Sequence, residues 1–130
     1  FTITMAVHGE EDDAEVQRYL EAQRVVQFGG KRVGLIHGHQ AEASNWLRKA
    51  LRLGPARRAE PARRAALASF NDVDCIVYGH THQPYVKMHD GVLLFNPGPA
   101  ARLAGQRPSV GILEIDARSM SGRIVYLDEV

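Results

Sequence analysis

Short apolar runs separated by glycine-bearing turns recur through most of the chain and predict β-strands. Two pairs of runs are joined by Gly29-Gly30 and by Asp90-Gly91, which are typical of tight hairpin turns. A third pair, at the end of the chain, is expected to turn around Ser121-Gly122. The expected strands lie within "TITMAV", "RVVQF", "RVGLIHGH", "CIVYGH", "YVKMH", "VLLFNPG", "SVGILEID" and "RIVYL".

Helix signals lie between some of these runs. Residues 14–20 are expected to form a short helix. Ser44 is an N-cap residue for a second helix over residues 45–53, and Pro61 suits the first turn of a third over residues 62–70. Strands with two or three helices between them predict an α/β or α+β sandwich, formed by the whole chain as one domain. Functional loops are expected at the strand ends.

Composition excludes several classes of function. The 130 residues match the length of about one domain, and a hydrophobic fraction of 45% is ordinary for a soluble protein. A formal net charge of +1 gives no global field that favours nucleic acid or anionic membrane. No apolar run approaches the roughly 18 residues of a membrane span. One cysteine permits no internal disulfide and fits the cytoplasm, and the opening inside a strand-like run, without methionine, suggests a piece of a longer protein.

Two His-x-His pairs are the strongest chemical signal. His37 and His39, and later His80 and His82, each follow a run of mostly apolar residues, and each pair has a glycine before or inside it. Alternate residues of an extended chain point to the same side. Imidazole binds borderline metals such as Zn, Mn, Fe or Ni, often with carboxylates completing the ligand set. The pairs therefore predict a metal site at the strand ends.

Other residues are open to a structural or a functional interpretation. The acidic stretch after His8 could supply carboxylates or be a solvated turn, and for Asp13 we favour a solvated helix N-terminus. The Asn96-Pro97-Gly98 sequence could line a site or be a simple turn. Cys75 is expected in the core and His89 at the surface. The arginines at 57, 58, 63 and 64 fit a solvated helix face better than a phosphate site.

The motifs "LIHGHQ", "YGHTHQPYV" and "FNPG", in this order and spacing, resemble those of the calcineurin-like metallophosphoesterase superfamily, in its YfcE-like phosphodiesterase branch. "AVHGEEDD" is similar to that family's strand followed by Gly-Asn-x-Asp. Two longer stretches also resemble the retromer subunit Vps29, which shares the fold. The resemblance implies a β-sandwich with flanking helices, of which this chain corresponds to about the C-terminal two thirds.

In that family two divalent metal ions, about 3.5–4 Å apart, clamp a phosphate ester. The resemblance implies that His37 and His80 bind one metal and His82 the other. Glu10 stands where the family has an asparagine that contacts a metal and the phosphate. The remaining expected residues, which orient ligands or line the phosphate pocket, are His39, Asp12, Asn96 and Gly98.

The chain also departs from the family pattern. It lacks the Asp-x-His strand end and the later Gly-Asp that supply most ligands of the first metal. Glu10 adds negative charge where the phosphate approaches, and Pro99 replaces a serine after Asn-Pro-Gly. The remaining donors suffice for one divalent ion (Mn, Zn, Fe or Ni) with an open position, and not for two.

The resemblance implies a hydrolase of phosphomonoesters or phosphodiesters that acts through a metal-bound water or hydroxide. Such a protein would bind a phosphate-ester substrate and no membrane, and it would bind nucleic acid only as a substrate. One alternative is a non-catalytic protein-binding scaffold of the same fold, like Vps29. Another is a shortened protein that forms a homo-oligomer through an exposed sheet edge.

Overall fold

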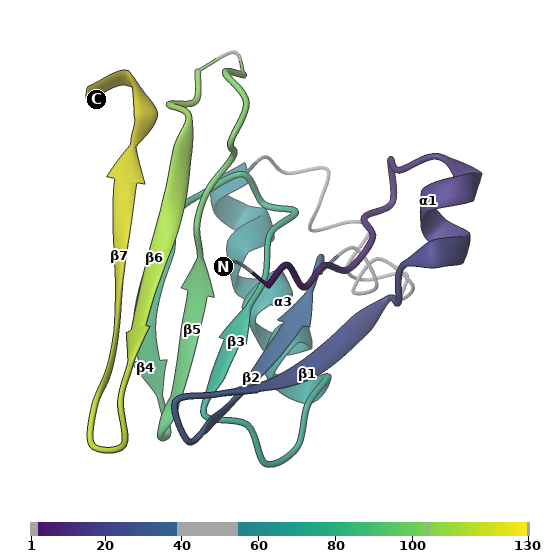
Figure 1. Cartoon of the computed structure of the whole chain (residues 1–130). Helices are drawn as coiled ribbons and strands as arrows, with labels where there is room; N and C mark the ends of the chain where they lie inside the picture. The colour runs from purple at the N-terminus through teal and green to yellow at the C-terminus, as the bar shows by residue number, and fades with distance from the viewer. Residues whose placement is uncertain (1–2, 39–54, 104, 130) are drawn as a thin grey trace.

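The computed structural model describes residues 3–38, 55–103 and 105–129 (Figure 1). The elements, in chain order, are α1 (Ala14–Tyr19), β1 (Gln23–Phe28), β2 (Lys31–Ile36), α3 (Pro55–Ala68), β3 (Cys75–Val77), β4 (Tyr85–His89), β5 (Val92–Asn96), β6 (Ser109–Ile115), β7 (Met120–Tyr126) and the 3-10 helix η2 (Leu127–Glu129). The helix expected over residues 45–53, with its cap at Ser44, lies outside the described residues. No helix in the described ranges has the length and apolar character that crossing a membrane requires.

The strands form two sheets. Five of them make one mixed sheet in the order β1-β2-β3-β5-β4, and β6 and β7 form a separate antiparallel pair. The two predicted hairpins are confirmed, because β1 pairs antiparallel with β2, and β4 with β5. In the centre β2, β3 and β5 run parallel. The carboxyl ends of these three strands therefore meet at one edge of the sheet, which is where open α/β sheets bind ligands.

The central strands β3 and β5 are largely buried, whereas the edge strands β1 and β4 are largely exposed. The buried cluster between the sheet and the α3 side consists of Ile36, Ala62, Ala66, Phe70, Ile76, Tyr78 and Leu94. Figure 1 shows α3 along the sheet. The buried cluster on the face toward β6 and β7 consists of Val33, Cys75, Leu93 and Phe95. Because successive strand residues point to opposite layers, β3 and β5 have continuous apolar sequences instead of alternating ones. The layering of helix, sheet and second sheet confirms the predicted α/β class.

The turn between β6 and β7 differs from the prediction. It lies at residues 116–119, and Gly122 sits inside β7, opposite Leu113. A Cβ atom at Gly122 would lie 2.1 Å from the Phe95 ring, and one at Gly111 would lie 2.2 Å from the same ring. The two glycines therefore make room for Phe95 between the sheets, and the expectation of a turn at Ser121-Gly122 was wrong.

Two further expectations need correction, while a third is confirmed. The segment "TITMAV" forms no strand among the described residues, and Val7 makes only an isolated bridge with Glu21. Helix α3 begins at Pro55, so that Pro61 lies within it. Proline is well tolerated at the start of a helix, and the alanines and arginines that follow favour helix, which explains the earlier start. The short helix after the acidic stretch is present as α1, with Asp13 as its N-cap.

Candidate metal centre

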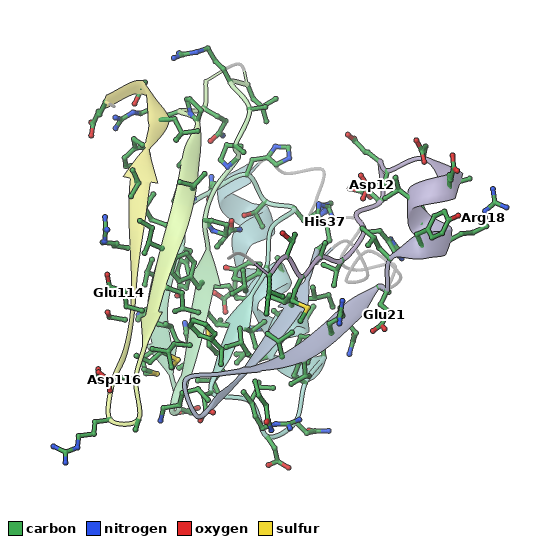
Figure 2. The ribbon with its side chains drawn as sticks, viewed as in Figure 1. Asp12, Arg18, Glu21, His37, Glu114 and Asp116 are labelled. Carbon is green, nitrogen blue, oxygen red and sulfur yellow. The ribbon has the colours of Figure 1, made fainter. Side chains whose placement is uncertain are left out.

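The carboxyl ends of the three parallel strands bring the predicted site residues together. His37 directly follows β2, residues 79–83 follow β3 after Tyr78, and Asn96 is the last residue of β5. We call residues 79–83 the histidine turn. The amide of Gly79 donates a hydrogen bond of 3.0 Å to the carbonyl of His37, which ties the first two segments together. Figure 2 shows His37 at this edge, with Asp12 on the neighbouring loop before α1.

A cavity of about 350 Å³ opens at this edge of the sheet. Its lining residues are Val7, Gly9, Glu10, Glu11, Asp12, His37, His80 and His82. The cavity thus gathers all four predicted ligands, together with Asp12. Asn96 and Gly98 are absent from this lining, and His39 lies outside the described residues.

Glu10 and His80 are in direct contact within this cavity. The Glu10 Oε1 atom lies 2.9 Å from His80 Nδ1, the His80 side chain is 7% exposed and that of Glu10 is 34% exposed. The ring of His37 approaches that of His80 edge-on, with 5.4 Å between the centroids. The Glu10–His80 distance is that of a hydrogen bond. Two donors at about 2.1 Å from one tetrahedral ion lie about 3.4 Å apart, so binding an ion between them would require only a small separation of the two side chains.

A local turn presents Glu10 to the cavity. The Gly9 amide donates to Asp12 Oδ2 at 2.6 Å, and the Asp12 amide donates to the Gly9 carbonyl at 3.4 Å. The segment is tied to the start of β1 by the His8 amide, which donates to the Glu21 carbonyl at 3.1 Å. A Cβ atom at Gly9 would lie 3.1 Å from the His37 ring, so the backbone packs closely there. Asp12 thus holds the turn that carries Glu10.

The histidine turn has an unusual backbone. His80 has a φ of 67° and His82 a φ of 58°, both in the left-handed region. Residues other than glycine are uncommon in this region, and such conformations persist where surrounding contacts enforce them. Strained residues also cluster at functional sites. The two cavity-lining histidines of this turn therefore depend on support from elsewhere in the fold.

Asn96 lies behind the cavity wall and not in it. Its side chain is buried, at 1% exposure, and its Nδ2 donates to the Gly79 carbonyl at 3.2 Å and to Thr81 Oγ1 at 3.0 Å. Its Oδ1 accepts a hydrogen bond of 3.0 Å from the Gly98 amide. Sequence reasoning did not single out Thr81, which is 4% exposed. Its position between two histidines is the only sequence signal that would have found it.

The side chains around the cavity are of the chemical types that bind a divalent metal ion, but they are not arranged around one point. Three imidazoles and a carboxylate surround one cavity, which is a suitable ligand chemistry for Zn, Mn, Fe or Ni. Among the described residues, however, no three His, Cys, Asp or Glu side chains converge closely enough to hold an ion. A metal would need these side chains to turn toward one point.

Cys75 and His89 have the structural roles expected of them, while the four arginines differ from one another. Burial raises the pKa of the Cys75 thiol to about 12, so it is a core residue and no nucleophile at neutral pH. His89 Nε2, at the end of β4, lies 2.8 Å from the Tyr85 hydroxyl. The side chain of Arg64 is largely exposed, as expected, whereas that of Arg63 is only 19% exposed, because it pairs with Glu60 at 3.0 Å and lies over the Tyr85 ring. The side chains of Arg57 and Arg58 lie outside the described part of the structure.

Known proteins resemble the chain in sequence and in fold. It is 29% identical over 102 residues to a probable metallophosphoesterase of Methanothermobacter thermautotrophicus, covering 78% of this chain and 51% of that protein. It is 38% identical over 55 residues to the phosphodiesterase YfcE of Escherichia coli K12, covering 42% of this chain and 30% of the enzyme. The crystal structure of a single mutant of Vps29 from Entamoeba histolytica matches with a TM-score of 0.58 at 25% identity, covering 95% of this chain and 68% of Vps29.

The chain thus spans at most about half the length of these two sequence relatives. The family model described as "Calcineurin-like phosphoesterase superfamily domain" matches residues 2–118, which is most of the sequence. The fold, the strand-end histidines and this match agree with one another. The chain belongs to the calcineurin-like phosphoesterase superfamily.

Proposed function

We propose that this chain holds one divalent metal ion and that the intact protein hydrolyses phosphomonoesters or phosphodiesters. The observation that supports the proposal is the single cavity lined by His37, His80, His82 and Glu10 at the carboxyl edge of the sheet. In this proposal the three imidazoles and the Glu10 carboxylate are the ligands. The ion is manganese, zinc, iron or nickel, and the protein acts in the cytoplasm.

Each ligand would have a distinct place in such a site. His37 follows a central strand and is fixed by the bond from the Gly79 amide to its carbonyl, so it anchors the ion to the sheet. His80 is nearly buried and already touches Glu10, so these two would close on the ion from one side. A bound divalent cation supplies Lewis acidity that activates water and offsets charge on the phosphate. His82 faces the same cavity and would complete the set.

The carboxylate of Glu10 sets a limit on catalysis by these residues. It strengthens cation binding, but it also repels an approaching phosphate, and Glu11 and Asp12 line the same cavity. A two-metal mechanism needs more ligands than the four side chains assigned to the ion here. We therefore assign hydrolysis to the intact protein, and metal binding to the chain described here.

Metal stoichiometry tests the proposal. After incubation with Mn²⁺ or Zn²⁺ and desalting, the chain is expected to retain about one equivalent, as measured by elemental analysis. His80→Ala is expected to reduce this value to background, while His89→Ala, which alters a histidine outside the cavity, is expected to leave it unchanged. A wild-type value equal to that of His80→Ala would refute the metal site. Hydrolysis of bis(p-nitrophenyl) phosphate and p-nitrophenyl phosphate by the metal-loaded intact protein then tests the enzymatic part.

A protein-binding scaffold is the second candidate, and an apolar groove favours it. A cavity of about 490 Å³ on the sheet face is lined by Ile3, Met5, Val26, Gln27, Phe28, Val33, Leu35, Val77 and Leu113. Ile3 and Phe28 are 68% and 58% exposed, and exposed apolar surfaces of this kind mark interaction sites. In this candidate the occupant is a partner protein or a second copy of the chain. Phosphoesterase activity that is lost in His80→Ala would decide for the enzyme.

A further inference from the structure

The histidine turn is held by a residue distant in sequence. Asn96, at the end of β5, reaches the turn through both of its Nδ2 hydrogen bonds, to the Gly79 carbonyl and to Thr81 Oγ1. Thr81 Oγ1 also accepts a hydrogen bond of 3.3 Å from the Gln83 amide. The bonded residues therefore flank His80 on both sides and His82 on both sides.

We propose that Asn96 and Thr81 are positioning residues, which keep His80 and His82 in the left-handed backbone that points both rings into the cavity. This inference rests on the proposed metal site for its functional consequence. It assigns Asn96 a different role from that of a phosphate-pocket residue, because at 1% exposure its amide is consumed by backbone and hydroxyl groups.

The geometry explains why these two residue types are needed. An amide side chain supplies two donors to the turn through Nδ2 and an acceptor to the Gly98 amide through Oδ1. Aspartate keeps the acceptor but lacks both donors. A hydroxyl at position 81 accepts from both Asn96 and Gln83, which valine cannot do. The backbone bond from the Thr81 amide to the Gly79 carbonyl, at 2.8 Å, closes a turn around His80 and does not enclose His82.

Backbone strain makes the support necessary. Both histidines occupy a region that side-chain sterics disfavour, so without the bonds the turn is expected to relax to negative φ values. Relaxation at either position would swing the imidazole away from the cavity. Partners that orient metal ligands in this way typically contribute 10- to 100-fold to metal affinity.

The experiment compares four variants of the full chain. Thr81→Val and Asn96→Asp break the bonds with little change of shape, while Thr81→Ser retains the hydroxyl. Ser109→Ala is the matched control, because Ser109 is buried to the same degree as Asn96 and its Oγ donates at 2.7 Å to the Pro97 carbonyl without touching the histidine turn. Thermal unfolding verifies that each variant folds.

Two readouts separate positioning from stability. In the metal-free protein, NMR ¹³Cα and ¹³Cβ shifts and the amide–α-proton couplings of His80 and His82 report φ. In the presence of Zn²⁺, chelator competition gives the dissociation constant. Thr81→Val and Asn96→Asp are expected to lose the left-handed signature and to weaken Zn²⁺ binding 10- to 100-fold. Thr81→Ser and Ser109→Ala are expected to match the wild type in both, whatever their thermal stability.

The outcomes distinguish this inference from the proposed function. Folded Thr81→Val and Asn96→Asp proteins with wild-type φ signatures and wild-type Zn²⁺ affinity would overturn it. A wild type that binds no Zn²⁺ would refute the metal site, while the NMR comparison would still decide the positioning role. Should Asn96→Asp fail to fold, the comparison of Thr81→Val with Thr81→Ser gives the answer alone.

Discussion

Polar side chains hydrogen-bond to backbone groups in both the histidine turn and the β6–β7 turn, residues 116–119. In the β6–β7 turn, Asp116 Oδ1 accepts from the amides of Arg118 and Ser119, each at 2.7 Å. Its Oδ2 accepts from the Ser119 hydroxyl at 3.0 Å. All of these partners lie within three residues of Asp116, and the turn is exposed to solvent.

The histidine turn is supported from a distance instead. Asn96 lies 15 residues from Thr81 and 17 from Gly79, and its bonds are buried. This support requires β3 and β5 to be paired first, since that pairing places Asn96 beside the turn. A connecting turn can thus be specified by four consecutive residues, while a turn that holds two left-handed histidines needs the assembled sheet.

The largest predicted loss of stability is at Gly122, which lies within β7 and outside the β6–β7 turn. Gly122→Ala is expected to destabilise the protein by about 2–3 kcal/mol, because its Cβ would collide with the Phe95 ring in a filled core. Urea unfolding monitored by circular dichroism measures this loss. Ser121→Ala, at an exposed neighbouring site, is expected to change stability by less than about 0.5 kcal/mol.

A second substitution identifies the cause. In the Phe95→Leu background, Gly122→Ala is expected to cost less stability than in the wild type, because the smaller side chain leaves room for the methyl group. Equal and small effects of the Gly122 and Ser121 substitutions would mean that Gly122 is not tightly packed against the Phe95 ring.

Local patterns predicted the hairpins of the five-stranded sheet, because their turn dipeptides and apolar runs are adjacent in sequence. They misplaced the last turn, since a glycine required by packing against Phe95 looks like a glycine required by a turn. "TITMAV" has β-favouring residues, but within the part of the chain that the structure describes its only pairing is the isolated bridge between Val7 and Glu21. β-propensity describes fit to a sheet and does not by itself create one.

In the candidate site, too, short sequence motifs predicted some residues, while the roles of others depend on strand pairing. The His-x-His pairs follow strands, so His37, His80 and His82 could be expected at one sheet edge, and all three line one cavity. Glu10 also lines this cavity, and it stands where the family resemblance implied a residue that contacts a metal. The role of Thr81 and the burial of Asn96 depend on the pairing of β3 with β5, which no short motif encodes.

Glu10, a proposed ligand that also contacts His80, has an intermediate predicted effect. Glu10→Gln preserves shape but removes the charge, so we expect Zn²⁺ binding to weaken about tenfold. Glu11→Gln is the matched control, because it removes the same charge from the same cavity wall. Isothermal titration with Zn²⁺ measures both variants. Equal losses would show that net charge, and not the Glu10–His80 contact, is responsible.

The smallest effect is expected at the local turn. The pKa of Asp116 is lowered because its carboxylate accepts hydrogen bonds from the Arg118 and Ser119 amides and the Ser119 hydroxyl. A lowered pKa in the folded state means that the stabilising contribution is complete above the unfolded pKa of about 4 and is lost as pH falls through the lower folded value. Asp116→Ala is therefore expected to be slightly less stable than wild type at pH 6, with a difference that narrows toward pH 3. Urea midpoints at both values measure it.

Asp116→Asn completes this last test, because the amide oxygen can still accept from both backbone amides but does not titrate. The Asp116→Asn protein is expected to be more stable than Asp116→Ala at pH 6. The difference in stability between Asp116→Asn and the wild type is expected to become smaller at low pH. None of these variants should alter Zn²⁺ affinity, since Asp116 lies at the opposite end of the strands from His37 (Figure 2). If Asp116→Ala lost as much stability as Gly122→Ala, the comparison of the two kinds of turn would be contradicted. An exposed turn held by its own residues would then contribute as much to stability as packing in the core.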